Sequence, residues 1–266
     1  MKTVLSGIFN TIRPHILKGL SVKKVGINSK GDVTKYFDKF CETKIISILR
    51  KLPVKATIIS EELKHPLIIN PSLKTQMHYI IIDPVDGSDN YLSGVPFVCL
   101  GIAVFDGNME PLYSLAGNYY TGDWFYADRR ALFLNGKKFD AVKAAKKPND
   151  IIYFAFTDTA VNLDNKFRKI FLYESGKVRS LGATIGELIL VIKGGAKSFI
   201  DIRNDLTPEN FAPFFLIAKH TKACFTDEYG MDFRLKSKRL TDGYNVVFSN
   251  NRHEHAKTIN KLGQIL

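Results

Sequence analysis

The sequence has few cysteines and no long apolar run, and both absences limit what the protein can be. Its three cysteines, Cys41, Cys99 and Cys224, lie far apart and lack the spacing of metal ligands. Because three cysteines cannot all pair within one chain, we expect a reducing compartment, the cytoplasm. No stretch approaches the roughly 20 apolar residues that span a bilayer as a helix, so we expect no contact with a membrane.

The first 20 residues also lack the features of a secretory signal. They have neither an unbroken apolar centre nor a small-residue cleavage site. Instead, apolar residues recur every four positions, with basic residues between them. This spacing predicts an amphipathic helix docked on the protein surface.

Acidic residues are in deficit, with 26 Asp and Glu against 38 Lys and Arg and a net charge of +12. The basic residues are nevertheless spread along the chain, without a long run and without the interleaved aromatic residues of a single-strand platform. We therefore do not expect a nucleic-acid partner. The same positive field would attract a small anionic substrate.

The length of 266 residues allows one large domain or two coupled halves. A polar stretch at 146–150 marks a boundary between an N-terminal α+β half, residues 1–148, and a C-terminal α/β half, residues 149–266. The patterns predict helices at 35–52, 163–173, 184–193 and 208–219, strands at 55–60, 78–82, 151–156, 177–180 and 198–202, and an antiparallel meander over 97–128 with a further hairpin at 135–136.

Acidic residues follow two of the predicted strands directly. Glu61 and Glu62 come after the strand at 55–60, and Asp83 comes after the strand at 78–82. If these strands are neighbours, their ends meet at one sheet edge, where ligands commonly bind in α/β proteins. Carboxylates gathered there repel one another unless a cation relieves the repulsion. Oxygen ligands without His or Cys favour Mg²⁺ over Zn²⁺.

The segment Asp83–Ser88 adds features that suit a phosphate. Pro84 stiffens the turn, Gly87 allows a close backbone approach, and Ser88 offers a hydroxyl and an N–H. Each acidic group alone is also common turn or helix-start chemistry. Their joint position after two apolar strands favours a metal site.

Residues 83–91, Asp-Pro-Val-Asp-Gly-Ser-Asp-Asn-Tyr, closely resemble the Asp-Pro-Ile-Asp-Gly-Thr-x-Asn-Phe signature of the inositol monophosphatase and fructose-1,6-bisphosphatase superfamily. Further similar segments follow in the family's order, and they are 31–42, 60–62, 179–184 and 194–201. The resemblance covers about residues 5–250, and the compact chain is similar to the archaeal and bacterial branch with both activities. It implies an α+β protein with the layered αβαβα sugar-phosphatase fold.

The resemblance also implies roles for individual residues. The implied metal ligands are Glu61, Asp83, the Val85 carbonyl, Asp86 and a third acid from the C-terminal half. The residues implied to activate the attacking water are Asp38, Ser88 and Glu61. The implied substrate contacts are Asp86, Gly87, Ser88, Gly182, Ala183, Thr184 and Asp201. We add Arg179 and Arg203, because guanidinium groups suit phosphate oxygens.

The C-terminal motif departs from the family pattern. Where the family has Trp-Asp or Thr-Asp before two small residues, residues 207–213 read Thr-Pro-Glu-Asn-Phe-Ala-Pro. We place Glu209 at the expected aspartate, in a helix start that Pro208 favours, with Asp205 as the fallback ligand. Because small-metal geometry is exacting, the longer glutamate side chain would weaken the second metal site.

The sequence therefore predicts a phosphomonoesterase that uses Mg²⁺, or Mn²⁺, to activate water against inositol monophosphate or fructose-1,6-bisphosphate. The family's common homodimer is expected. One alternative is a 3′(2′),5′-bisphosphate nucleotidase of the same superfamily, although the sequence reveals no slot for adenine. The other is a non-catalytic protein that binds a phosphosugar or RNA, which the altered motif and the basic surface would allow.

Overall fold

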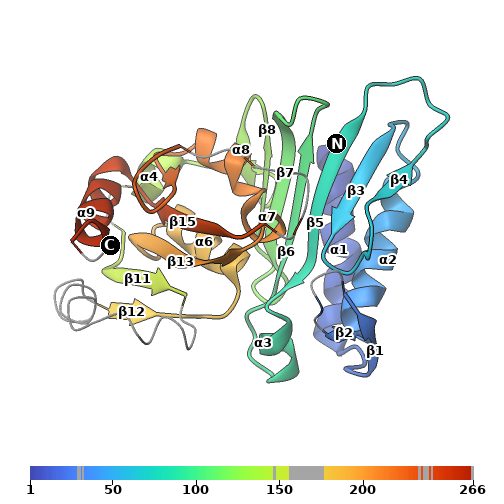
Figure 1. The fold of residues 1–266 in the computed structure, drawn as a ribbon, viewed down its shortest axis with the longest axis horizontal. Helices are drawn as coiled ribbons and strands as arrows, with labels where there is room; N and C mark the ends of the chain where they lie inside the picture. Colours follow the sequence, from blue (N-terminus) through green and yellow to red (C-terminus); the bar gives the residue numbers. More distant parts are fainter. Residues whose placement is uncertain are drawn as a thin grey trace.

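The computed structural model describes residues 1–28, 31, 33–145, 148–155, 177–232, 235, 240 and 242–264. Its elements form five layers (Figure 1). Two N-terminal helices cover a large sheet, further helices lie between that sheet and a smaller one, and the last helix covers the outer face of the smaller sheet. The predicted layered αβαβα architecture is confirmed.

The first layer consists of α1 (Lys2–Lys18) and α2 (Tyr36–Leu49), which contact each other and the large sheet. The predicted N-terminal helix is confirmed, and its buried side chains are Leu5, Ile8, Phe9, Ile12 and Ile16. A small hairpin of β1 (Lys24–Ile27) and β2 (Val33–Lys35) joins the two helices. None of the helices in the described part of the chain has the length and apolar character that crossing a bilayer requires.

The large sheet has eight strands in the order β10-β9-β8-β7-β6-β5-β3-β4. The strands are β3 (Ala56–Ser60), β4 (Leu67–Ile69), β5 (His78–Asp86), β6 (Cys99–Phe105), β7 (Pro111–Asn118), β8 (Trp124–Asp128), β9 (Leu132–Leu134) and β10 (Lys137–Lys138). From β5 to β10 each strand is antiparallel to the next, which confirms the predicted meander and hairpin. In contrast, β3 and β5 are parallel, with Ser60 opposite Ile82. Their carboxyl ends therefore meet at one edge.

The strand β5 is longer than predicted. It continues past Ile82 to Asp86, and its register with β6 shifts between Asp83 and Asp86. Pro84 lies within this irregular part, where a proline is tolerated because it cannot donate a ladder hydrogen bond. The short helix α3 (Ser88–Leu92) follows at once.

The small sheet has five strands in the order β12-β11-β13-β15-β14. The strands are β11 (Ile151–Phe154), β12 (Lys177–Arg179), β13 (Ser198–Leu206), β14 (Cys224–Thr226) and β15 (Tyr244–Ser249). The three strands predicted for this half are confirmed in position, although Phe156 and the predicted helix at 163–173 lie outside the described residues. The short helix α4 (Ala141–Ala145) precedes the sheet, and α9 (Arg252–Leu262) covers its outer face.

The middle layer contains α6 (Thr184–Ile192), as predicted, and two short helices where one was expected at 208–219. These are α7 (Pro208–Phe211) and α8 (Phe214–Lys219). The helix is interrupted between them because Pro213 has no N–H to continue the helical hydrogen bonds. As a separate turn, α7 lies against β5 and β6.

The two sheets share one hydrophobic core through this layer. Cys99 and Phe125 of the large sheet belong to the same buried cluster as Ile185 and Leu188 of α6 and Phe199 of the small sheet. The apolar surface of one half is thus covered by the other. The division at residue 148 stays a prediction.

Candidate active site

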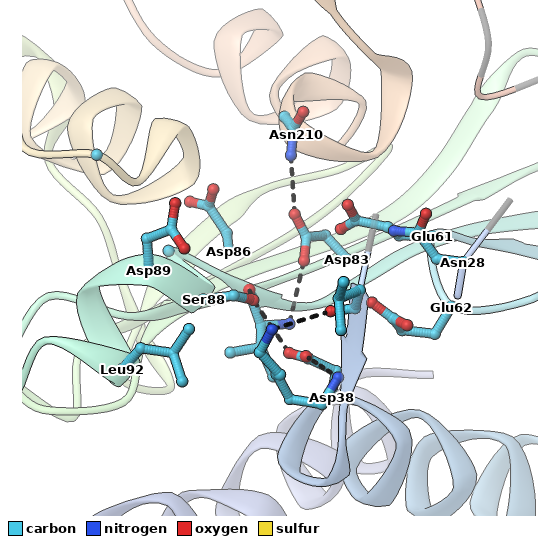
Figure 2. Close-up of a pocket in the computed structure, with 15 residues that line it drawn as sticks. Asn28, Asp38, Glu61, Glu62, Asp83, Asp86, Ser88, Asp89, Leu92 and Asn210 are labelled. Carbon is cyan, nitrogen blue, oxygen red and sulfur yellow. Dashed lines mark hydrogen bonds between the residues drawn. The ribbon is translucent and has the colours of Figure 1, made fainter. Parts of the chain in front are cut away.

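A pocket of about 560 Å³ lies where the carboxyl ends of β3 and β5 face α2, α3 and α7 (Figure 2). Eight predicted site residues line it, namely Asp38, Glu61, Asp83, Val85, Asp86, Gly87, Ser88 and Gly182. Glu62, predicted as part of the acidic cluster but without a role of its own, also lines the pocket. The lining residues that were not predicted are Asn28, Val33, Lys35, Asp89, Leu92 and Asn210. Residues up to 182 positions apart in the chain thus enclose one space.

Parallel pairing of β3 and β5 gathers the acidic residues. Glu61 and Glu62 follow β3 directly, at the level where β5 continues into Asp83. The Oδ1 atom of Asp83 accepts a hydrogen bond of 3.0 Å from the N–H of Val85. The hydroxyl of Thr34, on β2, donates to Glu62 Oε2 at 2.5 Å.

Asp38 and Ser88 meet across the pocket. Asp38 lies in the first turn of α2, where its Oδ2 atom accepts from the N–H of Lys35 at 3.2 Å. The Ser88 hydroxyl lies 3.0 Å from Asp38 Oδ1 and 3.0 Å from the Val85 carbonyl oxygen. This hydroxyl therefore connects a carboxylate to the backbone of β5.

Burial raises the pKa of Asp38 to about 7, and the neighbouring charge of Glu61 adds to the rise against the two hydrogen bonds that lower it. Burial also raises the pKa of Glu62 to about 7, against the Thr34 hydrogen bond, and the charge of Asp38 makes the largest contribution among the neighbouring acids. A carboxyl group whose pKa lies near 7 is suited to act as a general base at neutral pH.

Asp86 ties the pocket to the C-terminal half. Its two carboxylate oxygens accept from backbone N–H groups at the start of α6, from Thr184 at 3.2 Å and from Ile185 at 2.7 Å. Burial nevertheless raises the pKa of Asp86, and Glu61 contributes to the rise. A carboxylate at a helix N-terminus is favourable, so the pocket residue also fixes where α6 begins.

Gly87 occupies a position that a larger residue would not fit. Its φ of 91° is left-handed, and a Cβ atom there would lie 2.9 Å from the Phe97 carbonyl oxygen and 3.0 Å from the Ala183 side chain. Glycine at this point therefore lets the backbone turn with a left-handed φ and pack closely against Phe97 and Ala183.

Six predicted site residues are not among those that line the pocket: Arg179, Ala183, Thr184, Asp201, Arg203 and Glu209. Asp201 is fully buried and receives both arms of the Arg203 guanidinium, at 2.9 Å to Oδ1 and 2.6 Å to Oδ2. Arg179 donates to the Val178 carbonyl oxygen at 2.7 Å. Of the remaining predicted contacts, Ala183 is buried before α6, and Thr184 holds Asp86 through its N–H.

On α7 the structure places Asn210, rather than Glu209, in the pocket. Glu209 is 1% exposed, and its Oε1 atom accepts from the Thr207 hydroxyl at 2.6 Å. The Asn210 amide donates to Asp83 Oδ2 at 2.8 Å, as Figure 2 shows. Adjacent residues of a helix point about 100° apart, so Asn210 faces the pocket while the neighbouring Glu209 is buried. The fallback residue Asp205 is exposed on β13.

The donor chemistry of the pocket fits a hard divalent cation. Carboxylates of Glu61, Asp83 and Asp86 and the Val85 carbonyl offer oxygen atoms alone, and Lys35 is the one basic side chain among the described lining residues. Within the described ranges, however, no three His, Cys, Asp or Glu side chains lie close enough to hold an ion as they stand. The acidic side chains share the pocket without reaching ligand geometry.

Comparison with known proteins identifies the family. The chain matches the inositol monophosphatase family over residues 3–266 and belongs to it. This is a family of metal-dependent phosphomonoesterases, whose members typically act on phosphate esters.

Curated relatives cover nearly the whole chain. A fructose-1,6-bisphosphatase/inositol-1-monophosphatase of Methanocaldococcus jannaschii is 30% identical over 94% of this chain and 93% of its own. A fructose-1,6-bisphosphatase of Pyrococcus furiosus is 32% identical over 97% of this chain and 94% of its own.

Solved structures of similar proteins have the same fold. An inositol monophosphatase–fructose 1,6-bisphosphatase matches with a TM-score of 0.80 and 26% identity, over 98% of both chains. An extragenic suppressor protein of Bartonella henselae has the same fold, with a TM-score of 0.79 and 21% identity over 100% of this chain and 99% of its own.

Proposed function

We propose that the protein is a Mg²⁺-dependent phosphomonoesterase that hydrolyses inositol monophosphate, fructose-1,6-bisphosphate or both, with Mn²⁺ as a substitute ion. The observation that carries the proposal is the gathering of Asp38, Glu61, Asp83 and Asp86 in one pocket beside Ser88. The names of the archaeal relatives support the two substrates.

The metal would be held by Glu61, Asp83, the Val85 carbonyl and Asp86. When bound, a divalent cation supplies charge stabilisation at the phosphoryl oxygens and lowers the pKa of water. Val85 is suited to this role because its N–H already holds Asp83 at 3.0 Å, which orients the carboxylate relative to the carbonyl.

Asp38 and Ser88 would move the proton. The Ser88 hydroxyl donates to Asp38 Oδ1 and lines the pocket, so it would accept a proton from the attacking water while its own proton passes to Asp38. The raised pKa of Asp38, about 7, suits a base that works at neutral pH. Gly87 and Ser88 N–H groups would hold the phosphate, and Gly182 with Thr184 would contact the polyol.

The Asp201–Arg203 pair bears on the choice of substrate. The Arg203 guanidinium gives two of its N–H groups to the fully buried Asp201 carboxylate, and among the described lining residues of the pocket there is no arginine to bind a second phosphate. This pairing favours inositol monophosphate over a bisphosphate as the better substrate. We propose that the pocket lies between the halves 1–148 and 149–266.

The test is release of phosphate from inositol 1-phosphate, fructose 1,6-bisphosphate and adenosine 3′,5′-bisphosphate, with Mg²⁺ and with a chelator. We expect release from at least one of the first two, only with the metal, and loss of turnover in Asp83→Asn. Asp205→Asn, a change of the same kind on the exposed part of β13, should retain activity.

Release that persists after chelation, or a fully active Asp83→Asn protein, would remove the metal role. Turnover of the nucleotide alone would favour the nucleotidase. Binding of a phosphosugar without turnover of any substrate would favour a non-catalytic protein.

A further inference from the structure

The contact between Asn210 and Asp83 places a neutral amide inside a cluster of acids. Asn210 reaches Asp83 from α7 in the middle layer, and its Nδ2 atom donates to Asp83 Oδ2 at 2.8 Å (Figure 2). The Asn210 carbonyl oxygen lies on the other side of the amide, 3.3 Å from the Thr207 hydroxyl. Since the one proton of the Thr207 hydroxyl goes to Glu209 at 2.6 Å, the amide is held mainly through its Nδ2 atom on Asp83.

Neighbouring carboxylates on this side of the pocket are also held by N–H groups. Asp83 Oδ1 accepts from Val85, and the oxygens of Asp86 accept from Thr184 and Ile185. From the C-terminal half, the described lining residues are Gly182 and Asn210. Neither brings a negative charge, so all the acidic lining residues come from the N-terminal half.

The number of anionic ligands sets how tightly a site binds a hard cation. Two divalent ions in one pocket repel each other, and each needs carboxylates of its own to offset that repulsion. At the position of Asn210 an N–H points at Asp83, where a second ion would need a ligand oxygen. To present its own oxygen, the amide would have to break its hydrogen bond to Asp83 and turn over.

We propose that Asn210 limits the pocket to one tightly bound divalent cation, leaving a second ion weakly bound. The inference rests on the proposed function, since it assumes that the pocket binds such ions. Its consequence is specific to this side chain: Asn210→Asp should add an anionic ligand of nearly the same size and create a second tight site.

The experiment is calorimetric titration of the chelator-treated protein with Mn²⁺ and with Mg²⁺. Wild type should bind one ion tightly, and Asn210→Asp should bind two, with the affinity for the second raised about tenfold or more. Asn210→Ala removes the hydrogen bond without adding charge and should still bind one ion tightly. Thermal melting of each variant without metal establishes that it is folded.

Asn108→Asp is the matched control. Asn108 is exposed in the turn between β6 and β7, near Gln76 at the opposite end of β5 from Asp83. The same added charge there should leave both stoichiometry and affinity as in wild type.

Two tight ions in the wild type would overturn the inference, and so would an Asn210→Asp protein with the wild-type stoichiometry. The wild-type titration decides the question even where a variant fails to fold. Absence of any bound ion in wild type and variants alike would instead refute the proposed metal dependence, so the two failures are distinguishable.

Discussion

Ser88 is the residue through which the backbone of β5 and the side chain of Asp38 are connected. Its hydroxyl has polar partners 3.0 Å away on both elements. If this hydroxyl passes the proton of the attacking water, its loss should affect the chemical step more than substrate binding.

We therefore expect Ser88→Ala to lower kcat by about 10²-fold or more, the usual contribution of general acid–base groups, with a smaller change in KM. Steady-state phosphate release measures both constants. Ser93→Ala, at the exposed end of the same short helix, is the control and should behave as wild type. A Ser88→Ala enzyme with unchanged kcat would exclude the relay.

At the residue scale, the sequence predicted those pocket side chains that lie close together in the chain. It missed those whose position depends on packing between distant segments. Asp83, Asp86 and Ser88 follow one another along a strand end, so their common location is readable from spacing. Asn210 enters from α7, far away in the chain, and the orientation of that single turn decides which of two adjacent residues faces the pocket. The pairing of Arg203 with Asp201 likewise needed the folded backbone.

The helix α6 carries a buried acid that the proposed chemistry does not use. Glu187 is 3% exposed, and its Oε1 atom accepts from the N–H of Leu181 at 2.5 Å. Burial raises the pKa of Glu187 to about 8, and the charges of Asp86 and Asp201 add to the rise. At neutral pH this shift favours the protonated form of Glu187 in the folded protein, whereas the unfolded chain has the group ionised.

This difference predicts how stability depends on pH. Between about 4.5, the ordinary pKa, and about 8, the unfolded chain has lost the proton that the folded protein retains. The free energy of unfolding therefore falls as pH rises through that window. Glu187→Gln keeps the acceptor for Leu181 but cannot ionise, so it should flatten the fall and stabilise the protein at pH 9, on the order of a few kcal/mol.

Urea unfolding at pH 5, 7 and 9 measures the effect. Glu110→Gln, whose side chain is 61% exposed, should leave the pH profile unchanged. The acidic pocket residues contribute a slope of the same sign in both proteins, so the comparison isolates Glu187. A Glu187→Gln protein with the full wild-type fall would contradict the assignment.

At the element scale, alternating and helical spacing of apolar residues was sufficient to predict those strands and helices whose apolar faces are regular. The predicted element boundaries were wrong where a single proline alters the hydrogen-bonding pattern of the backbone. Pro213 does so between α7 and α8, and Pro84 does so within β5. The strands β14 and β15 were not predicted at all. Their antiparallel pairing, of β15 with β13 and of β14 with β15, is long-range, although the residues of β15 are themselves typical of a strand.

At the scale of the whole molecule, the pocket and the hydrophobic core both join the large sheet to the middle layer. Asp86 holds α6 through two backbone N–H groups, and α6 buries Ile185 and Leu188 in the cluster that contains Phe125 of the large sheet. Although the sequence suggests two halves, neither sheet has a complete core without the middle layer. We expect the chain to unfold as one unit.

The single tryptophan, Trp124 on β8, makes this expectation measurable, because its fluorescence reports on the large sheet while far-ultraviolet circular dichroism reports on both. The two signals should give coincident transitions in urea.

Ile185→Ala, which removes fully buried side-chain volume from α6, should destabilise the protein by about 2–5 kcal/mol and shift both transitions equally. Val142→Ala, at a 55% exposed position of α4, should shift neither. If Ile185→Ala left the fluorescence midpoint in place while the dichroism transition split in two, the halves would be independent, and the middle layer would belong to the small sheet alone.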